Sequence, residues 1–364
     1  RLEYRGYDSA GVALLSDSKI YVRKTPGKIN DLIGIVNKNP LPKAMLGIAH
    51  TRWATHGAPN ETNAHPHMSC DKKITVVHNG IIENYLNLKT SLIKEGHRFL
   101  SQTDTEVLAH LIEKYYKGNL KEAVISALKR VEGSFAIAVI STEEPDKIVA
   151  SRKDSPLILA EDKEGRFIAS DVPAILERAK KVIYLKDKEV AVLTNDKIEL
   201  FDLNNKKLKV KFDKVTLDAE SAQKGGFPHF MMKEMHEQPA VLKRLLSGGL
   251  KDIKGYAFPK NIKNIVVVAC GTAYHAGLVG KYIIESLVRL PVLVDMSSEF
   301  RYRDPIISKD TLVIAVSQSG ETADTLAAVR EAKKKGARIL SICNVVGSSL
   351  TRESDKVFYT LAGP

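Results

Sequence analysis

The stretch TLVIAVSQSGETADT, from Thr311 to Thr325, decides the fold of the C-terminal part of the chain. Its first six residues are apolar and rich in β-branched side chains, which is typical of a buried strand. The residues from 321 onward place apolar side chains at helical spacing, and Gly336 is a helix stop signal. The sequence therefore predicts a strand, a tight turn and the start of a helix.

The turn between this strand and this helix is rich in hydroxyl groups. A helix N-terminus leaves backbone N–H groups unpaired and carries the positive end of the helix dipole. Ser317, Ser319 and Thr322 add hydroxyl donors, and Gly320 lets the backbone approach a ligand closely. Ser319 could simply cap the helix, but three hydroxyls beside a glycine favour a phosphate site. No lysine follows the glycine, so the turn is not a nucleotide P-loop.

A second turn of the same kind lies in IVVVACGTAYHAG, residues 265–277. Gly271 and Thr272 lie where the predicted strand ends, and Cys270 is the last residue of that strand. We expect the side chain of Cys270 to be packed rather than to act as a nucleophile. Strands and helices alternate from about Asn261 onward, which predicts a doubly wound parallel sheet with ligands at the carboxyl ends of its strands.

The first part of the chain has a different pattern. Short apolar segments between Arg1 and about Leu217 indicate strands, namely GVALL, MLGIAH, ITVVHNG, SFAIAVI, LILA, FIAS, EVAVLT and KIELF. Helices are expected at about Thr105–Tyr116 and Leu120–Arg130. This mixture predicts an α+β domain with mainly antiparallel sheets. We expect domains at residues 1–217 and 241–364, with a linker at 218–240 that leads into a helix.

Composition narrows the class of protein. The chain has 364 residues, a net charge of +12 and three widely spaced cysteines, Cys70, Cys270 and Cys343. Such cysteines fit reduced thiols and a cytoplasmic location. The lysines are scattered and no apolar run has membrane-spanning length, so we expect neither nucleic acid nor membrane as a partner. The chain begins without Met and stops straight after a predicted strand, and we interpret it as a fragment.

Five of the ten histidines lie close together in the sequence, so a metal site must be considered: His50, His56, His65, His67 and His78. The segment has no HExxH pattern, no cysteine pair and no carboxylate at helical spacing from a histidine. The sequence therefore predicts no metal site.

Polar residues in the same region fit the binding of an amino acid. Arg52 and Trp53 follow a predicted strand and offer a planar fork for a carboxylate and an apolar wall. Asn79 and Gly80 follow another strand, and a side-chain amide beside a glycine N–H is the composition of an oxyanion hole. Asp104, taken alone, is a helix N-cap residue.

With these residues in view, the chain resembles the glutamine–fructose-6-phosphate aminotransferase (isomerizing) family. The motifs that carry the resemblance are, in order, LEYRGYDSAG, HTRWATHG, NAHPH, HNGIIENY, TDTEV, GSFA, CGTA, SQSGETADT and NVVGSSLTRESD. The resemblance implies an N-terminal-nucleophile fold of the class II glutamine amidotransferases, an αββα sandwich with two stacked antiparallel sheets between helix layers. It implies that a sugar isomerase (SIS) module, an α/β unit with a parallel sheet, follows.

The resemblance also implies roles for particular residues. Arg52 would bind the α-carboxylate of glutamine and Asp104 its α-amino group. Thr55 and His56 would line the glutamine pocket, and Trp53 would gate the path of ammonia. The remaining implied roles are an oxyanion hole, from Asn79 and Gly80, and a fructose 6-phosphate site, from Thr272, Ser317, Gln318, Ser319 and Thr322.

Two parts of the family pattern are missing from residues 1–364. The nucleophile of the family is an N-terminal cysteine, expected upstream of Arg1, and a second SIS module is expected beyond Pro364. The complete protein would hydrolyse glutamine, channel ammonia and convert fructose 6-phosphate to glucosamine 6-phosphate without a cofactor, as a homodimer or higher homo-oligomer. The fragment alone would be inactive.

Two alternatives remain. Another class II glutamine amidotransferase, such as an amidophosphoribosyltransferase, would need a loop of acidic pairs followed by small residues, and nothing after Asn261 resembles one. A non-catalytic sugar-phosphate-binding regulator would usually carry a helix-turn-helix domain, which the strand-rich first half argues against.

Overall fold

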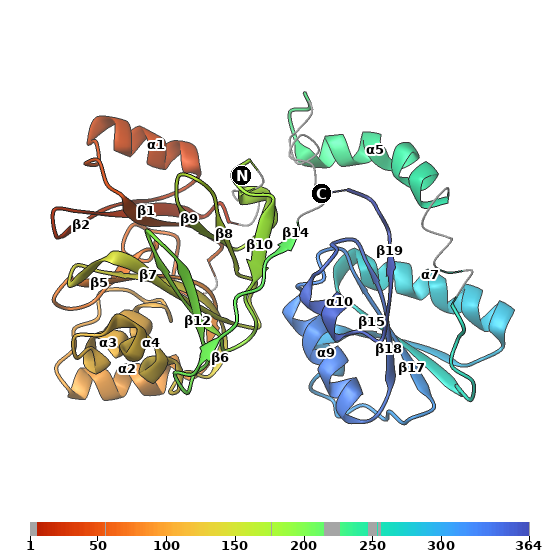
Figure 1. The fold of residues 1–364 in the computed structure, drawn as a ribbon. Helices are drawn as coiled ribbons and strands as arrows, with labels where there is room; N and C mark the ends of the chain where they lie inside the picture. The colour runs from red at the N-terminus through yellow and green to blue at the C-terminus, as the bar shows by residue number, and fades with distance from the viewer. Residues whose placement is uncertain are drawn as a thin grey trace. The chain divides into compact units, whose positions relative to one another are not determined.

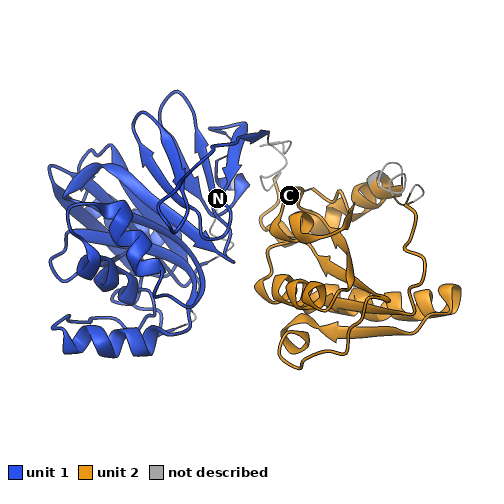
Figure 2. Ribbon diagram, turned by 60° about the horizontal axis from the view of Figure 1, so that its bottom comes forward, with its two compact units in different colours: residues 1–216 blue, residues 217–364 orange. Residues whose placement is uncertain are grey.

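The computed structural model describes residues 6–54, 56–175, 177–214, 226–246, 253 and 256–363. The chain divides into two compact units, residues 1–216 and 217–364 (Figure 2). Each unit has its own hydrophobic core, and each is described by itself below.

A seven-stranded antiparallel sheet forms the centre of the first unit (Figure 1). In spatial order its strands are β13 (Lys207–Leu208), β12 (Ile198–Phe201), β11 (Val190–Thr194), β7 (Glu144–Lys153), β6 (Gly133–Ser141), β5 (Ile74–Ile82) and β4 (His67–Met68). The central strands β5 and β6 are apolar on both faces, which means that both faces of the sheet are covered.

Two smaller antiparallel sheets pack on one face of this sheet. One has the order β2 (Lys19–Pro26), β1 (Ser9–Ser16), β3 (Leu46–Arg52), and the other β14 (Asp213–Lys214), β10 (Lys181–Tyr184), β8 (Ile158–Glu161), β9 (Arg166–Ala169). Ala13 and Ile48 of the first meet Val77 and Ile140 of the large sheet. The sandwich expected from the sequence is therefore confirmed, but its second sheet layer is divided into two sheets.

Helices form the outer layers of the sandwich. On the other face of the large sheet lie α2 (Tyr85–Lys94), α3 (Glu106–Tyr115) and α4 (Leu120–Leu128), and α1 (Ile29–Lys38) lies against β1 and β2. A short 3-10 helix, Val172–Ala174, follows β9. The two helices predicted from the sequence agree with α3 and α4 within two residues. The elements that the sequence analysis did not name include β2, α1, α2, β7 and β10.

The second unit is a five-stranded parallel sheet, as the alternating pattern predicts. Its order is β16 (Val292–Met296), β15 (Asn264–Ala269), β17 (Thr311–Ser317), β18 (Arg338–Cys343), β19 (Lys356–Tyr359). The helix α7 (Gly271–Val288) packs on one face, while α8 (Ser297–Phe300), α9 (Ala323–Lys334) and α10 (Ser349–Glu353) pack on the other.

The strand order of this sheet fixes the position of a binding crevice. The chain passes from β15 outward to β16 and then returns to β17 on the other side of β15, so the order reverses between β15 and β17. Ligands of open parallel sheets bind at the carboxyl ends of the strands at such a reversal. The two polar turns found in the sequence follow these two strands.

The segment expected to be a linker, residues 218–240, is described only from residue 226. From Phe230 it belongs to the helix α5 (Phe230–Arg244), which contains Pro239. Among the described residues no helix is both long and apolar enough to span a bilayer.

Candidate functional site

Arg52, at the end of β3, is a buried cation of the first unit. Its Nη2 donates to the carbonyl oxygens of His56 and, at 3.2 Å, Gly57, which holds the guanidinium plane in place. Its Nη1 is buried and has no hydrogen-bond partner among the described residues. Burial lowers the pKa of Arg52, while the carboxylates of Asp104 and Asp8 oppose this shift. A buried guanidinium donor without a partner is suited to a carboxylate ligand.

Asp104 lies beside this arginine. Its Oδ2 accepts a 2.8 Å hydrogen bond from the backbone N–H of Ile82, and its Oδ1 is 4.0 Å from Nδ1 of His56. Asp104 precedes α3 by two residues, and Thr105, not Asp104, is the N-cap residue of that helix. The capping role that the sequence alone favoured for Asp104 is therefore wrong. The carboxylate is held against β5 instead, close enough to Arg52 to affect its pKa.

Asn79 and Gly80 lie near the end of β5, on the same strand as Ile82. The side chain of Asn79 is exposed. Gly80 has a φ of 139° and pairs with Phe135 of β6, and a Cβ atom there would lie 2.2 Å from the carbonyl oxygen of Ser134. Only glycine fits this strand pairing. The side-chain amide of Asn79 is thus exposed to solvent. It lies on the same strand as Ile82, whose backbone N–H donates to Asp104.

Trp53 and Thr55 are the two other residues expected around glutamine. The Trp53 side chain is 57% exposed and makes an edge-to-face contact with Tyr7, with ring centroids 5.3 Å apart. The indole is thus exposed directly after β3, one residue beyond Arg52. Thr55 lies outside the described residues.

Four histidines pack behind Arg52 and Asp104: His50, His65, His67 and His78. The rings of His50 and His65 stack at 4.3 Å, and the ring of His67 meets that of His65 at 4.9 Å. Nδ1 of His78 lies 2.9 Å from the hydroxyl of Thr105. Burial is the main cause that lowers the pKa of His50 and of His67 to about 3, and it also lowers the pKa of His65 and His78. These rings are neutral and serve as polar packing.

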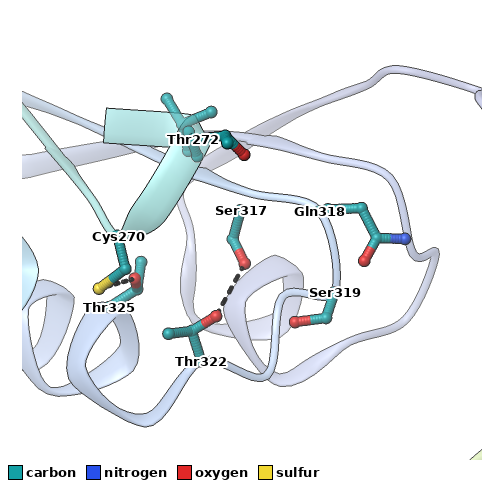
Figure 3. Close-up of a pocket in the computed structure, with 9 residues that line it drawn as sticks. Cys270, Thr272, Ser317, Gln318, Ser319, Thr322 and Thr325 are labelled. Atoms are coloured by element: carbon teal, nitrogen blue, oxygen red, sulfur yellow. Dashed lines mark hydrogen bonds between the residues drawn. The ribbon is translucent and has the colours of Figure 1, made fainter. Parts of the chain in front are cut away.

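In the second unit, the two polar turns line one cavity of about 240 Å³ (Figure 3). The residues around it are Cys270, Thr272, Ala273, Val316, Ser317, Gln318, Ser319, Thr322 and Thr325. All five residues that the sequence analysis assigned to the sugar phosphate are among them. The N-termini of two helices, α7 and α9, lie at this cavity, because Thr272 is in the first turn of α7 and Thr322 immediately precedes α9.

The hydroxyl-rich turn keeps its shape through internal hydrogen bonds. The N–H of Gly320 donates to Oγ of Ser317 at 3.0 Å, and the N–H of Glu321 donates to Oγ of Ser319 at 3.2 Å. Gly320 has a φ of 64°, and a Cβ atom there would lie 2.1 Å from Oγ of Ser348. The turn therefore requires glycine at residue 320, both for its backbone conformation and for its close packing.

Helix capping does not explain these hydroxyls. The N-cap residue of α9 is Thr322, whose side chain makes no capping hydrogen bond, and Ser319 lies outside the helix. The interpretation of Ser319 as the helix cap is wrong. Among the described residues that line the cavity there is no lysine or arginine. An anion in this cavity would thus be held by hydroxyl and backbone N–H donors and by two helix dipoles.

Four lining residues were not assigned to the site from the sequence: Cys270, Ala273, Val316 and Thr325. Of these, Thr325 is a buried hydroxyl. The hydroxyl of Thr325 lies 3.1 Å from Oγ of Ser297 and 3.9 Å from Sγ of Cys270. Its position in the first turn of α9 places it on the side of the helix that faces the end of β15. The sequence signal that could have identified Thr325 was its spacing of three residues from Thr322, because residues three apart lie on the same face of a helix.

Comparison with known proteins supports the two-unit description. Residues 50–177 match the family model of the glutamine amidotransferase domain, and residues 260–364 match that of the SIS domain. A glutamine–fructose-6-phosphate aminotransferase [isomerizing] of Clostridium tetani is 55% identical over the whole chain, and one of Clostridium acetobutylicum is 53% identical. The chain is therefore a relative of these aminotransferases. It spans 61% of the length of each of them.

A solved structure extends the comparison at the level of the fold. The glutamine phosphoribosylpyrophosphate amidotransferase from B. subtilis, in complex with ADP and GMP, has a TM-score of 0.51 and 15% identity. The match covers 99% of this chain and 87% of that one. At this identity the likeness concerns the fold alone. The fold class predicted from the sequence and the resemblance to the aminotransferase family are both confirmed.

Proposed function

We propose that the protein containing this chain hydrolyses glutamine in its first unit and uses the ammonia to convert fructose 6-phosphate to glucosamine 6-phosphate. The observation that carries the proposal is the open buried donor of Arg52 beside Asp104, in a chain 55% identical to an aminotransferase of this name. A free amino acid presents one carboxylate and one ammonium group, and this cluster offers a counter-charge for each.

Each of the proposed site residues in the first unit then has a defined role. Nη1 of Arg52 binds the α-carboxylate of glutamine, and the carboxylate of Asp104 binds the α-ammonium group. The exposed amide of Asn79 and the backbone N–H of Gly80 stabilise the negative charge that develops on the amide oxygen. His56 lines the pocket, and Trp53 gates the path of ammonia. A role in the same pocket is expected for Thr55, which lies outside the described residues. The nucleophilic cysteine is assigned to none of the three cysteines of this chain.

The second unit binds the sugar phosphate. The phosphate group lies between the N-termini of α7 and α9, where Thr272, Ser317, Gln318, Ser319 and Thr322 line the cavity. A volume of about 240 Å³ is sufficient for a hexose phosphate whose sugar end extends into solvent or toward a further part of the protein. The proposal includes a cytoplasmic homodimer or higher homo-oligomer, as expected from the family.

The test uses the full-length protein and glutamine labelled with ¹⁵N in its side-chain amide. With fructose 6-phosphate as acceptor, we expect glutamate release and labelled glucosamine 6-phosphate, detected by mass spectrometry. Excess unlabelled ammonium should dilute the label little if the ammonia is channelled. Transfer of the label to phosphoribosyl diphosphate, or no transfer to fructose 6-phosphate, would overturn the proposal.

A further inference from the structure

Four potential metal ligands meet on the first unit, away from the residues assigned to glutamine. Cys70 lies in the turn between β4 and β5, and His97 follows α2. His110 and Glu113 lie one helical turn apart on α3. Sγ of the cysteine, one ring nitrogen of each histidine and one carboxylate oxygen all lie within 4.8 Å of one another.

The separations between these atoms are those of a tetrahedral site. Sγ of Cys70 is 3.4 Å from Nδ1 of His110 and 3.8 Å from Nδ1 of His97. Oε2 of Glu113 is 3.0 Å from Nδ1 of His97 and 3.5 Å from Nδ1 of His110. Zinc bonds of about 2.3 Å to sulfur and about 2.0–2.1 Å to nitrogen and oxygen place tetrahedral ligand atoms roughly 3.3–3.6 Å apart. Two of the four observed separations, 3.4 and 3.5 Å, lie within this range, and the other two, 3.0 and 3.8 Å, lie just below and just above it.

We propose that Cys70, His97, His110 and Glu113 bind a structural Zn²⁺ ion. A thiolate with two imidazoles selects zinc over magnesium and calcium, which prefer oxygen ligands. Four protein ligands complete a tetrahedral shell and leave no position for a substrate, which is the arrangement of a structural zinc site rather than a catalytic one.

The groups around these ligands support the proposal. Nε2 of His110 is buried without a hydrogen bond and lies 3.6 Å from Oε1 of Glu106. A carboxylate behind a histidine commonly orients the ring so that its other nitrogen faces the metal. The backbone N–H of Arg98 donates to Sγ of Cys70 at 3.3 Å, the kind of hydrogen bond that orients a ligating sulfur.

Glu106 also connects this cluster to the residues proposed to bind glutamine. Its carboxylate accepts hydrogen bonds from the N–H groups of Leu100 and Ser101, in the segment that leads to Asp104. Zinc would thus fix two loops to α3, the helix that begins directly after Asp104 and Thr105. The sequence predicted no metal site, and that expectation concerned the histidines of residues 50–78. The four ligands proposed here are 27, 13 and 3 residues apart, a spacing that matches none of the common zinc motifs.

The same contacts could instead be a hydrogen-bond network without metal. Glu113 accepts hydrogen bonds from the backbone N–H groups of Cys70, at 3.3 Å, and Asp71, at 3.0 Å. A network of this kind would hold the turn but would bind no zinc. Measurement of the metal separates the two explanations.

The first experiment measures zinc in the full-length protein, purified without chelator and without a metal-affinity resin. We expect about one zinc per chain, as for a closed four-ligand site. Cys70→Ser and His97→Ala, which alter groups at the edge of the cluster, should lose most of this zinc. The matched controls Cys270→Ser and His275→Ala change a thiol and an imidazole outside the cluster and should retain it.

The second experiment uses chelated protein to which metal is returned. Co²⁺ should produce the intense visible bands of a tetrahedral site and a thiolate charge-transfer band, and the latter should be absent in Cys70→Ser. Zn²⁺ at about 100 times its Kd should raise the melting temperature of the first unit by roughly 5–10 °C. Equal zinc contents in wild type and both ligand variants, or no binding of Zn²⁺ by the chelated wild type, would overturn the proposal.

Discussion

The two proposed binding regions of this chain present charge in opposite ways. In the first unit, Arg52 and Asp104 are buried side chains of opposite charge that come from segments 52 residues apart. In the second unit, the polar lining of the cavity at the ends of β15 and β17 consists chiefly of hydroxyls, one side-chain amide and two helix N-termini, and the described lining residues include no lysine or arginine. The first site depends on long-range packing, whereas the second is built from two short turns. This difference predicts how each region responds to acid and to substitution.

Acid should have the largest effect, and it should act on the first unit. His50 and His67 have a pKa of about 3 in the folded protein but about 6.5 when unfolded. The unfolded chain therefore takes up protons that the folded chain does not, so stability is lost as the pH falls from 6.5 toward 3. Between pH 7 and pH 5 each of these two rings should cost about 2 kcal/mol of stability.

Calorimetry of the two transitions at pH 7 and pH 5 checks this expectation. The described histidines of the second unit, His229, His236 and His275, are all exposed, so that unit should lose much less. His67→Gln should reduce the pH dependence of the first unit by about one proton. Equal losses in both units would show that the buried rings do not control acid stability.

Gly320→Ala should have the next largest effect, on the second unit. A left-handed conformation and a contact of 2.1 Å with Oγ of Ser348 together should destabilise the unit by about 2–5 kcal/mol. Fructose 6-phosphate binding should be lost with the shape of the turn. Gly280→Ala is the matched control, because nothing lies within 4 Å of a Cβ there and alanine should stabilise α7 by about 0.5–1 kcal/mol. Urea unfolding measures both; equal stabilities of the two variants would contradict the prediction.

Arg52→Lys should have a smaller effect, confined to glutamine. Lysine keeps the positive charge but has all its donors on one nitrogen, so it lacks the planar fork by which Nη2 binds the backbone carbonyls while Nη1 is presented to the ligand. The loss of one charge-assisted hydrogen bond, about 1.5–3 kcal/mol, should raise KM for glutamine about ten- to hundredfold in the full-length enzyme. Arg178→Lys, at an exposed ion pair, is the control. An unchanged KM would remove Arg52 from the carboxylate role.

Ser319→Ala should have the smallest effect of the four. It removes one hydroxyl among several donors, so the Kd of fructose 6-phosphate should rise roughly tenfold, as expected for one hydrogen bond to a charged group. Titration calorimetry of the full-length protein measures it. Ser286→Ala, on the exposed side of α7, should leave Kd unchanged. If both variants bind alike, Ser319 does not contact the phosphate.

The second unit was the more predictable one, for a physical reason. A buried parallel strand is a continuous apolar run, and the turn after it can be found in the same stretch of sequence. All five predicted phosphate residues therefore line one cavity. The strands missed in the first unit are of another kind, because β2 and β7 contain polar and charged residues at exposed positions and resemble loops in isolation.

What the sequence determined by itself was local: the strand-turn-helix units, the alternation that produces a parallel sheet, and the motifs shared with the aminotransferases. The tertiary structure decided which polar groups have partners. It showed that Asp104 contacts β5 rather than capping α3, that Thr325 joins the cavity, and that Cys70 meets His97, His110 and Glu113. These contacts join residues far apart in the chain, and their distances depend on packing between elements, which local propensity and periodicity do not specify.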